Sequence, residues 1–291
     1  MASPVAPFSP APRGAPASLF RYGLAVAITV VAILSQYVVP TWLPASIVVY
    51  GNLPGDLLVV YGLPIVAFAT LVGGAPLRDW SSRMRLAAAE GFGWFGALSL
   101  LALLVLVALV LIYLAVDPSA LGLLNRPNPA LEAARGNPWF YVGFSFVIGA
   151  FEETIFRGWI FGYWRDRPGS WVGPAVWTSA LFALVHLYYA TTYLAAAPLL
   201  FPTLFLLGLS FAATYRYSGG NLVVPAALHG AQDALAFLTL VPAGFASLAV
   251  PVHYLLILGG ALLFLLRFVR RRASLGPPLG AIAAGPPTAP P

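Results

Sequence analysis

The chain has 291 residues, of which 60% are hydrophobic and 8% are charged, and its formal net charge is +6 at pH 7. Soluble domains carry about 25% charged residues, so this chain has too few ionic groups to cover a water-facing surface, and lipid is its expected solvent. The absence of cysteine excludes disulfides, thiol nucleophiles and cysteine metal ligands. The basic residues are scattered between apolar segments, which is typical of oriented membrane helices and not of a nucleic-acid-binding patch.

Apolar runs of about twenty residues predict membrane helices, and the chain has eight of them. The first run is longer than the core of a signal peptide, which has about 7–15 residues, so we expect it to be a membrane span. The sequence therefore predicts an all-α polytopic membrane protein with about eight transmembrane helices. The runs cover residues 22–39, 56–75, 91–116, 138–163, 172–190, 194–214, 221–241 and 246–268.

The two ends of the chain differ in composition from its apolar centre. Residues 1–20 are expected to form a proline-rich tail, followed by a transmembrane domain over residues 21–272. Residues 273–291 are rich in proline, glycine and alanine and are expected to form a disordered tail. With eight spans, twelve arginines fall on one side of the membrane and two on the other, and Arg157 lies within a span. Because positive charge marks the cytoplasmic side, both termini are predicted to be cytoplasmic.

Three acidic residues and all three histidines lie inside apolar runs, where an ionisable group needs a partner or a function. Glu152 and Glu153 are adjacent in the fourth run, so on a helix they point about 100° apart and cannot share a role. Glu153 precedes Arg157 by four residues, the favourable order for an ion pair, and we expect these two to hold one another. Glu152 is left without a local counter-ion, which suits it to take a proton from water.

The fifth and seventh runs each contain a histidine at helical spacing from a second notable residue. Phe182 and His186 lie one turn apart, as do His229 and Asp233, so each pair shares a helix face. Each pattern alone is also typical of a structural histidine or an interhelical lock. His253 in the eighth run has no polar neighbour at helical spacing and is interpreted as structural.

Three motifs in this order, each in its own span, resemble the signature of the CPBP family, the CAAX-protease and bacteriocin-processing proteins, also called the Abi family. The motifs are Glu-Glu-x-x-x-Arg at 152–157, Phe-x-x-x-His at 182–186 and His-x-x-x-Asp at 229–233. Residues 217–225 also look like the family's approach to its last histidine motif. The resemblance covers residues 138–240, and the family includes the type II CAAX prenyl endopeptidases.

The resemblance implies an intramembrane endopeptidase with eight helices and a conical cavity open to the cytoplasmic side. The implied location is a bacterial cell membrane, and the implied substrates are membrane-associated peptides or proteins, either CAAX-like or leader peptides. Carried onto this sequence, Glu152 and His186 would activate the water, and His229 and the residue at 233 would stabilise the oxyanion. The supporting residues would be Glu153, Arg157 and Phe182.

One position departs from the prenyl endopeptidases, which have asparagine where this chain has Asp233. An ionised aspartate cannot donate to an oxyanion, so Asp233 is either protonated, or orients His229, or binds a metal. A zinc ion held by His186, His229 and Glu152 or Asp233 would use the same side chains as a metal-free mechanism. The sequence leaves both mechanisms open.

Two other functions remain as alternatives. A proton-coupled transporter could use the same groups as a relay, although such proteins often show internal repeats, and none is convincing here. A catalytically silent relative could act as an immunity factor or a scaffold. The sequence contains no His-Glu-x-x-His motif, no pair of aspartates within span cores and no Gly-x-Ser-x-Gly motif, which excludes three other types of intramembrane protease. It does not specify the substrate or the oligomeric state.

Overall fold

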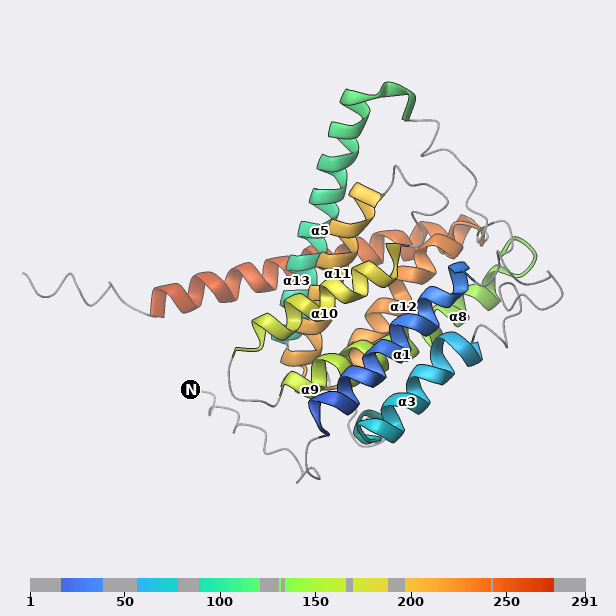
Figure 1. Ribbon diagram of the computed structural model, residues 1–291. Helices are drawn as coiled ribbons and strands as arrows, with labels where there is room; N and C mark the ends of the chain where they lie inside the picture. The colour runs from blue at the N-terminus through green and yellow to red at the C-terminus, as the bar shows by residue number, and fades with distance from the viewer. Residues whose placement is uncertain are drawn as a thin grey trace, which may run out of the picture.

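The computed structural model describes residues 17–38, 57–77, 89–120, 131, 134–165, 170–187, 197–241 and 243–274. Every regular element among these residues is a helix, so the predicted all-α class is confirmed for this part of the chain (Figure 1). The predicted tails lie mostly outside it. The main helices are α1 (Leu19–Val38), α3 (Leu63–Leu71), α5 (Ala89–Val116), α8 (Pro138–Glu153), α9 (Gly162–Arg165), α10 (Val172–Val185), α11 (Ala197–Tyr217), α12 (Val223–Leu238) and α13 (Ala243–Ser274).

Two π-helical segments extend this set, and both lie beside the site described below. Segment η2 (Leu57–Gly62) leads into α3, and segment η4 (Thr154–Phe161) joins α8 to α9. Segments with the wider π-helical hydrogen-bond spacing are rare in proteins and occur frequently at functional sites. The apolar pattern of the sequence did not predict them.

Within the described part of the chain, four stretches of helix are long and apolar enough to cross a bilayer, so the chain is an integral membrane protein. The other four apolar helices are shorter. The predicted number of eight spans and the orientation of the termini therefore stay predictions. The four long stretches are Ala89–Val116, Pro138–Trp164, Pro198–Tyr217 and Ser247–Arg271, and the shorter helices are Leu19–Ser35, Leu58–Leu71, Val172–Val185 and Val223–Leu238.

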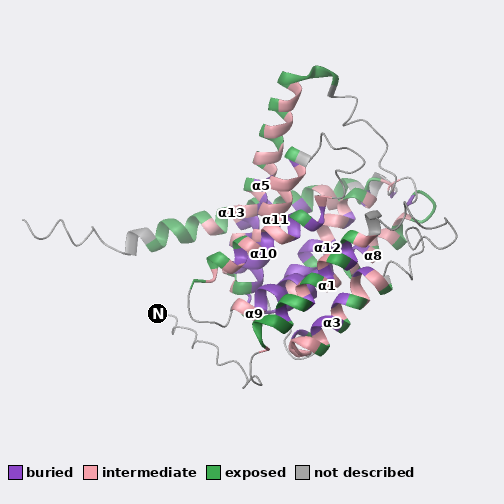
Figure 2. Cartoon of the chain, in the orientation of Figure 1, coloured by how far each residue is buried: buried purple, intermediate pink, exposed green. Residues whose placement is uncertain are grey.

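The helices pack in pairs around a buried centre. Helix α8 packs against α12, α5 packs against both α11 and α13, α10 packs against α11, and α1 packs against α3. Figure 2 shows that buried residues concentrate where η4, α10, α11 and α12 meet, whereas the far end of α5 has only exposed and intermediate residues and residues 267–271 of α13 are exposed. Glu152, Glu153, His186 and His229 are buried at this centre.

Small residues allow α8 and α12 to approach closely. A Cβ atom added to Gly149 would lie 2.8 Å from the backbone nitrogen of Gly230, and one added to Gly230 would lie 2.6 Å from Cα of Phe146. In lipid, where apolar surface gains little from burial, helix association depends on such close packing. The contact aligns the end of α8, which carries two glutamates, with the histidine on α12.

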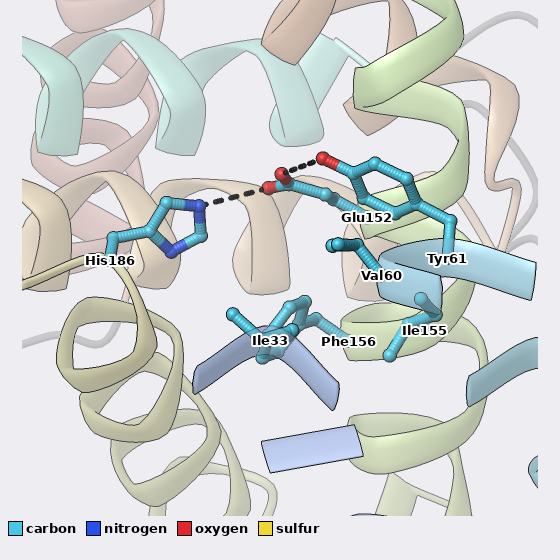
Figure 3. A pocket seen from close by; sticks show the side chains of 7 residues that line it. All are labelled: Ile33, Val60, Tyr61, Glu152, Ile155, Phe156 and His186. Carbon is cyan, nitrogen blue, oxygen red and sulfur yellow. Dashed lines mark hydrogen bonds and ion pairs between the residues drawn. The ribbon is translucent and has the colours of Figure 1, made fainter. Parts of the chain in front are cut away.

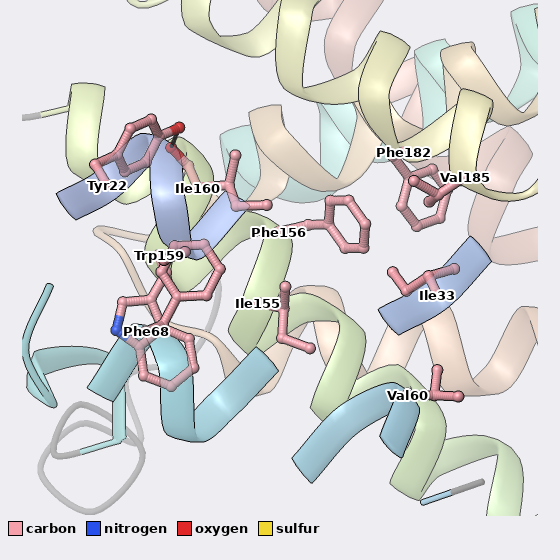
Figure 4. Close-up of a cluster of buried hydrophobic side chains, with 11 residues drawn as sticks. Tyr22, Ile33, Val60, Phe68, Ile155, Phe156, Trp159, Ile160, Phe182 and Val185 are labelled. Carbon is pink, nitrogen blue, oxygen red and sulfur yellow. Dashed lines mark hydrogen bonds between the residues drawn. The ribbon is translucent and has the colours of Figure 1, made fainter. Parts of the chain in front are cut away.

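A cluster of aromatic and branched side chains joins α1 and α3 to η4 and α10 (Figure 4). Phe68 stacks on Trp159 with ring centroids 5.4 Å apart, and Tyr22 donates a hydrogen bond from its hydroxyl to the carbonyl of Ile160 at 3.1 Å. Phe156 packs edge-on against Phe182. This cluster fixes the amino-terminal helices against the segments that carry the candidate site.

Candidate active site

Glu152 and Glu153 are the last two residues of α8, at its junction with η4. The next residue, Thr154, donates a hydrogen bond from its side chain to the carbonyl of Ala150 at 2.7 Å. Threonine side chains that bond to the carbonyl four residues earlier tend to bend helices. The two carboxylates thus lie where the helix changes its geometry, inside the protein.

Glu152 lies between two imidazoles that come from other helices. Its Oε2 atom is 3.2 Å from Nε2 of His186 and 3.7 Å from Nε2 of His229. Figure 3 shows Glu152 and His186 pointing toward one another. All three residues are buried, so their charges interact in a medium that screens them less than water does. The structure therefore brings these three predicted site residues together at one point.

The ring of His186 is fixed from its other side. Its Nδ1 atom lies 2.7 Å from the carbonyl oxygen of Phe182, and the two rings are 4.3 Å apart. Because a carbonyl oxygen only accepts hydrogen bonds, Nδ1 carries the proton. In neutral His186, Nε2 is then an acceptor, and this atom faces Glu152. Phe182, predicted as a supporting residue, positions His186 through both its carbonyl and its ring.

Glu153 belongs to a second, fully buried cluster. Its Oε1 atom lies 2.8 Å from Nη1 of Arg157, which confirms the expected ion pair, and also 2.8 Å from Nδ1 of His229. Arg157 donates a further hydrogen bond to the carbonyl of Gly208 on α11 at 2.9 Å. The His229 ring stacks on Phe211 at 4.7 Å. The cluster therefore holds the His229 ring by its Nδ1 atom and by one face.

The guanidinium of Arg157 is enclosed by aromatic rings. Its central carbon lies 4.6 Å from the ring centroid of Phe182 and 5.2 Å from that of Phe211. Cation–π contacts of this kind stabilise a desolvated guanidinium. Since these rings also contact His186 and His229, the Arg157 side chain is packed against both histidine-bearing segments.

Asp233 lies on the open side of the site. Its Oδ2 atom is 3.6 Å from Nε2 of His229, and 40% of its side chain is exposed. It thus shares the Nε2 atom with Glu152, whereas the Nδ1 atom is bonded to Glu153. One of the three roles predicted for Asp233 was to orient His229. Glu153 is the residue that holds the Nδ1 atom of this ring, and Asp233 lies beside Nε2.

A cavity of about 30 Å³ lies beside Glu152 and His186 (Figure 3). A cavity needs about 10–15 Å³ to hold one water molecule, so this one accommodates a water next to the carboxylate. Apart from its 3.2 Å contact with Nε2 of His186, the buried Oε2 atom of Glu152 has no hydrogen bond within the described part of the chain. The lining residues are Ile33, Val60, Tyr61, Glu152, Ile155, Phe156 and His186.

Tyr61 is a site residue that the sequence did not indicate, because it lies in the second apolar run, outside the three motifs. Its hydroxyl donates a hydrogen bond to Oε1 of Glu152 at 3.2 Å. A tyrosine in an apolar run carries no motif, and its partner is 91 residues away along the chain. No local pattern could have indicated this contact.

A metal ion was the other use predicted for the same side chains. Among the described residues, no group of three or more His, Asp or Glu side chains has an arrangement that could hold one. The metal-dependent mechanism therefore stays a prediction from the residue types alone, and the mechanism developed below uses the protein's own groups.

The fold and the site define a helical membrane protein with a buried glutamate–histidine centre. Residues 134–235 match the family model for type II CAAX prenyl endopeptidase Rce1-like proteins, so this part of the chain is an Rce1-like domain and the resemblance found in the motifs is confirmed. This is a family of intramembrane proteases, and all the motif residues lie inside the matched segment, whereas Tyr61 lies outside it. No curated protein and no solved structure matches the chain.

Proposed function

We propose that this protein is an intramembrane endopeptidase that hydrolyses a peptide bond in membrane-associated substrates, either CAAX-like proteins or leader peptides. The observation that carries the proposal is the buried Oε2 atom of Glu152, which has two imidazole nitrogens within 4 Å and a water-sized cavity beside it. A carboxylate kept in such a place needs a function, because burial of a charge is costly.

Glu152 acts as the general base, and His186 positions the water. The Oε2 atom of Glu152 and the Nε2 atom of His186 lie 3.2 Å apart, which leaves no room for a water between them. The water instead lies in the cavity that both residues line, where it donates a hydrogen bond to the Glu152 carboxylate and is held in place by the adjacent imidazole. Its lone pair is then directed at the scissile carbonyl. As the oxygen–carbon bond forms, Glu152 takes the proton from the water, which contributes about 10²–10⁴-fold to the rate.

His229 stabilises the oxyanion that forms at the carbonyl oxygen. Its Nδ1–H is bonded to Glu153, so its Nε2 atom donates when the ring is an imidazolium. The nearby carboxylates of Glu153 and Asp233 stabilise this positive charge. A donor of this kind is worth about 10²–10³-fold in kcat.

The intermediate collapses when the carbon–nitrogen bond breaks and the leaving amine takes the proton that Glu152 removed from the water. The water is thus divided between the products, its hydroxyl on the new carboxyl group and its proton on the amine, and Glu152 regains its charge. No redox partner or further reactant is required.

The test is a cleavage assay in liposomes with a panel of prenylated CAAX peptides and unmodified leader peptides. Glu152→Gln and His229→Ala are expected to abolish cleavage, whereas His253→Ala, which alters a buried histidine on α13 away from the site, is expected to retain it. Full activity of Glu152→Gln would refute the mechanism.

Two further arms of the assay address the alternatives. Cleavage that a chelator abolishes and zinc restores would replace the metal-free mechanism by a metal-dependent one. Proton flux through the liposomes that Glu152→Gln abolishes, without any cleavage, would favour a transporter. Absence of both activities over the whole panel would favour a silent relative.

A further inference from the structure

The two oxygen atoms of Glu152 have different neighbours. Oε2 faces the imidazoles of His186 and His229, whereas Oε1 accepts a hydrogen bond from the hydroxyl of Tyr61 at 3.2 Å. In Figure 3 the Tyr61 ring reaches the carboxylate from the side opposite His186. The carboxylate is therefore bound at one oxygen and faces the histidines with the other.

A free glutamate carboxylate would rotate readily about its terminal torsion, which is broad. Its two oxygens are equivalent, so the angle of the carboxylate plane, and not the identity of the oxygen, decides how the group faces the histidines. A hydroxyl that donates to one oxygen holds this angle, since an ionised carboxylate only accepts hydrogen bonds. The bond of Tyr61 therefore fixes the orientation in which the other oxygen faces the imidazoles.

The Tyr61 ring is itself held in place. It stacks on Phe151, the residue before Glu152, with ring centroids 5.5 Å apart and an angle of 18° between the rings. The ring also lines the cavity together with Val60 from η2 and Ile33 from α1. The hydroxyl thus reaches Glu152 from a packed wall formed by the two amino-terminal helices.

We propose that Tyr61 is the positioning residue of the catalytic base: its hydroxyl binds Oε1 of Glu152 and thereby presents Oε2 to the water and to the two histidines. This inference rests on the proposed peptidase function. It also gives the amino-terminal helices, which lie outside the matched family segment, a direct part in the reaction.

Tyr61→Phe tests this role because it removes the hydroxyl and keeps the stacked ring. We expect kcat to fall about 10- to 100-fold, the usual cost of misplacing a reacting group by about an ångström, with KM and thermal stability close to wild type. The matched control is Tyr163→Phe, which removes a hydroxyl bonded to the carbonyl of Ala17 at 3.1 Å, outside the site. The control is expected to retain its kcat.

The outcomes separate this inference from the proposed function. If wild type cleaves and Glu152→Gln does not, a decrease in kcat of fivefold or more in Tyr61→Phe alone supports the role of Tyr61, and a smaller decrease overturns it. A KM increase in place of a kcat decrease would also overturn it, because it would assign Tyr61 to substrate binding. Wild type without cleavage, or active Glu152→Gln, would refute the proposed function itself and this role with it.

A second measurement does not depend on turnover. The infrared carboxylate band of Glu152, assigned by its loss in Glu152→Gln, is expected to shift in Tyr61→Phe and to stay in place in Tyr163→Phe. If Tyr61→Phe folds poorly, Phe151→Leu keeps the hydroxyl and removes only the stacked partner, and a smaller shift in the same band is expected. An unchanged band in whichever of these variants folds would overturn the inference.

Discussion

The buried Glu153–Arg157 pair offers the most informative test of how the site is held together. Glu153 is fully buried and Arg157 is 2% exposed, and they are joined at 2.8 Å. Removing one partner of such a pair costs about 3–5 kcal/mol, because the other charge stays desolvated, whereas replacing both by apolar residues is often close to neutral. Glu153→Leu or Arg157→Met alone should therefore lower the free energy of unfolding by about 3–5 kcal/mol.

Two double variants then separate the fold from the chemistry. Glu153→Leu with Arg157→Met should recover most of the stability and leave a deficit of about 1–3 kcal/mol, because Nδ1 of His229 loses its acceptor. The kcat of this double variant should remain about 10²–10³-fold below that of wild type, which is the usual effect of losing one oxyanion donor. Glu153→Gln with Arg157→Met keeps a neutral acceptor for Nδ1 and should be within about tenfold of wild type.

The measurements are denaturant unfolding in detergent and cleavage kinetics on the same preparations. The surface control is Arg271→Gln, which breaks a 2.9 Å ion pair with Glu90 whose arginine is 71% exposed and should cost under about 1 kcal/mol. Equal activity of the two double variants would refute the claim that Glu153 orients His229. A loss in the single variants as small as that of the control would refute the burial argument.

Further variants test the packing and the remaining ionisable groups. Gly230→Ala places a Cβ atom 2.6 Å from Cα of Phe146, so it should lower the free energy of unfolding by about 1–3 kcal/mol and reduce the cleavage rate. The control is Gly143→Ala on α8, where the added Cβ atom meets open space, and it should change neither the unfolding free energy nor the cleavage rate. Asp233→Asn removes the carboxylate charge beside His229 but keeps a polar side chain that can donate to the oxyanion, so it should stay active, while Asp233→Ala should lose cleavage. Equal rates would contradict a role for this position. His253→Ala should cleave at the wild-type rate, and a loss would show that the site extends to α13.

Contacts that follow from helix geometry could be predicted from the sequence. The four-residue spacing of Glu153 and Arg157 fixes both on one face of a single helix, and the expected pair is present. The apolar runs likewise indicated the helices, since the length of a membrane-spanning run is set by the thickness of the bilayer. The three motifs identified the family of the matched segment.

Contacts between helices could not be predicted in this way. The bond from Glu153 to His229 joins residues 76 apart, and the bond from Tyr61 to Glu152 joins residues 91 apart. Both depend on how closely separate helices approach, and the second also depends on the π-helical segment η2 that carries Tyr61. The spacing of residues within one helix does not determine contacts between separate helices, so the sequence predicted only Arg157 as the partner of Glu153.

Glu152 and Glu153 are adjacent in the sequence, and both lie close to the ring of His229. On α8 their side chains diverge by about 100°, which excluded a shared role. In the structure Glu153 contacts Nδ1 of His229 at 2.8 Å, while Glu152 lies 3.7 Å from Nε2 of the same ring. The two neighbouring carboxylates thus lie beside different nitrogens of one imidazole: Glu153 is bonded to Nδ1, and Glu152 faces Nε2. The close contact of Gly149 with Gly230 sets the distance between α8 and α12. The different contacts that the two glutamates make with His229 therefore depend on two glycines that have no reactive side chain.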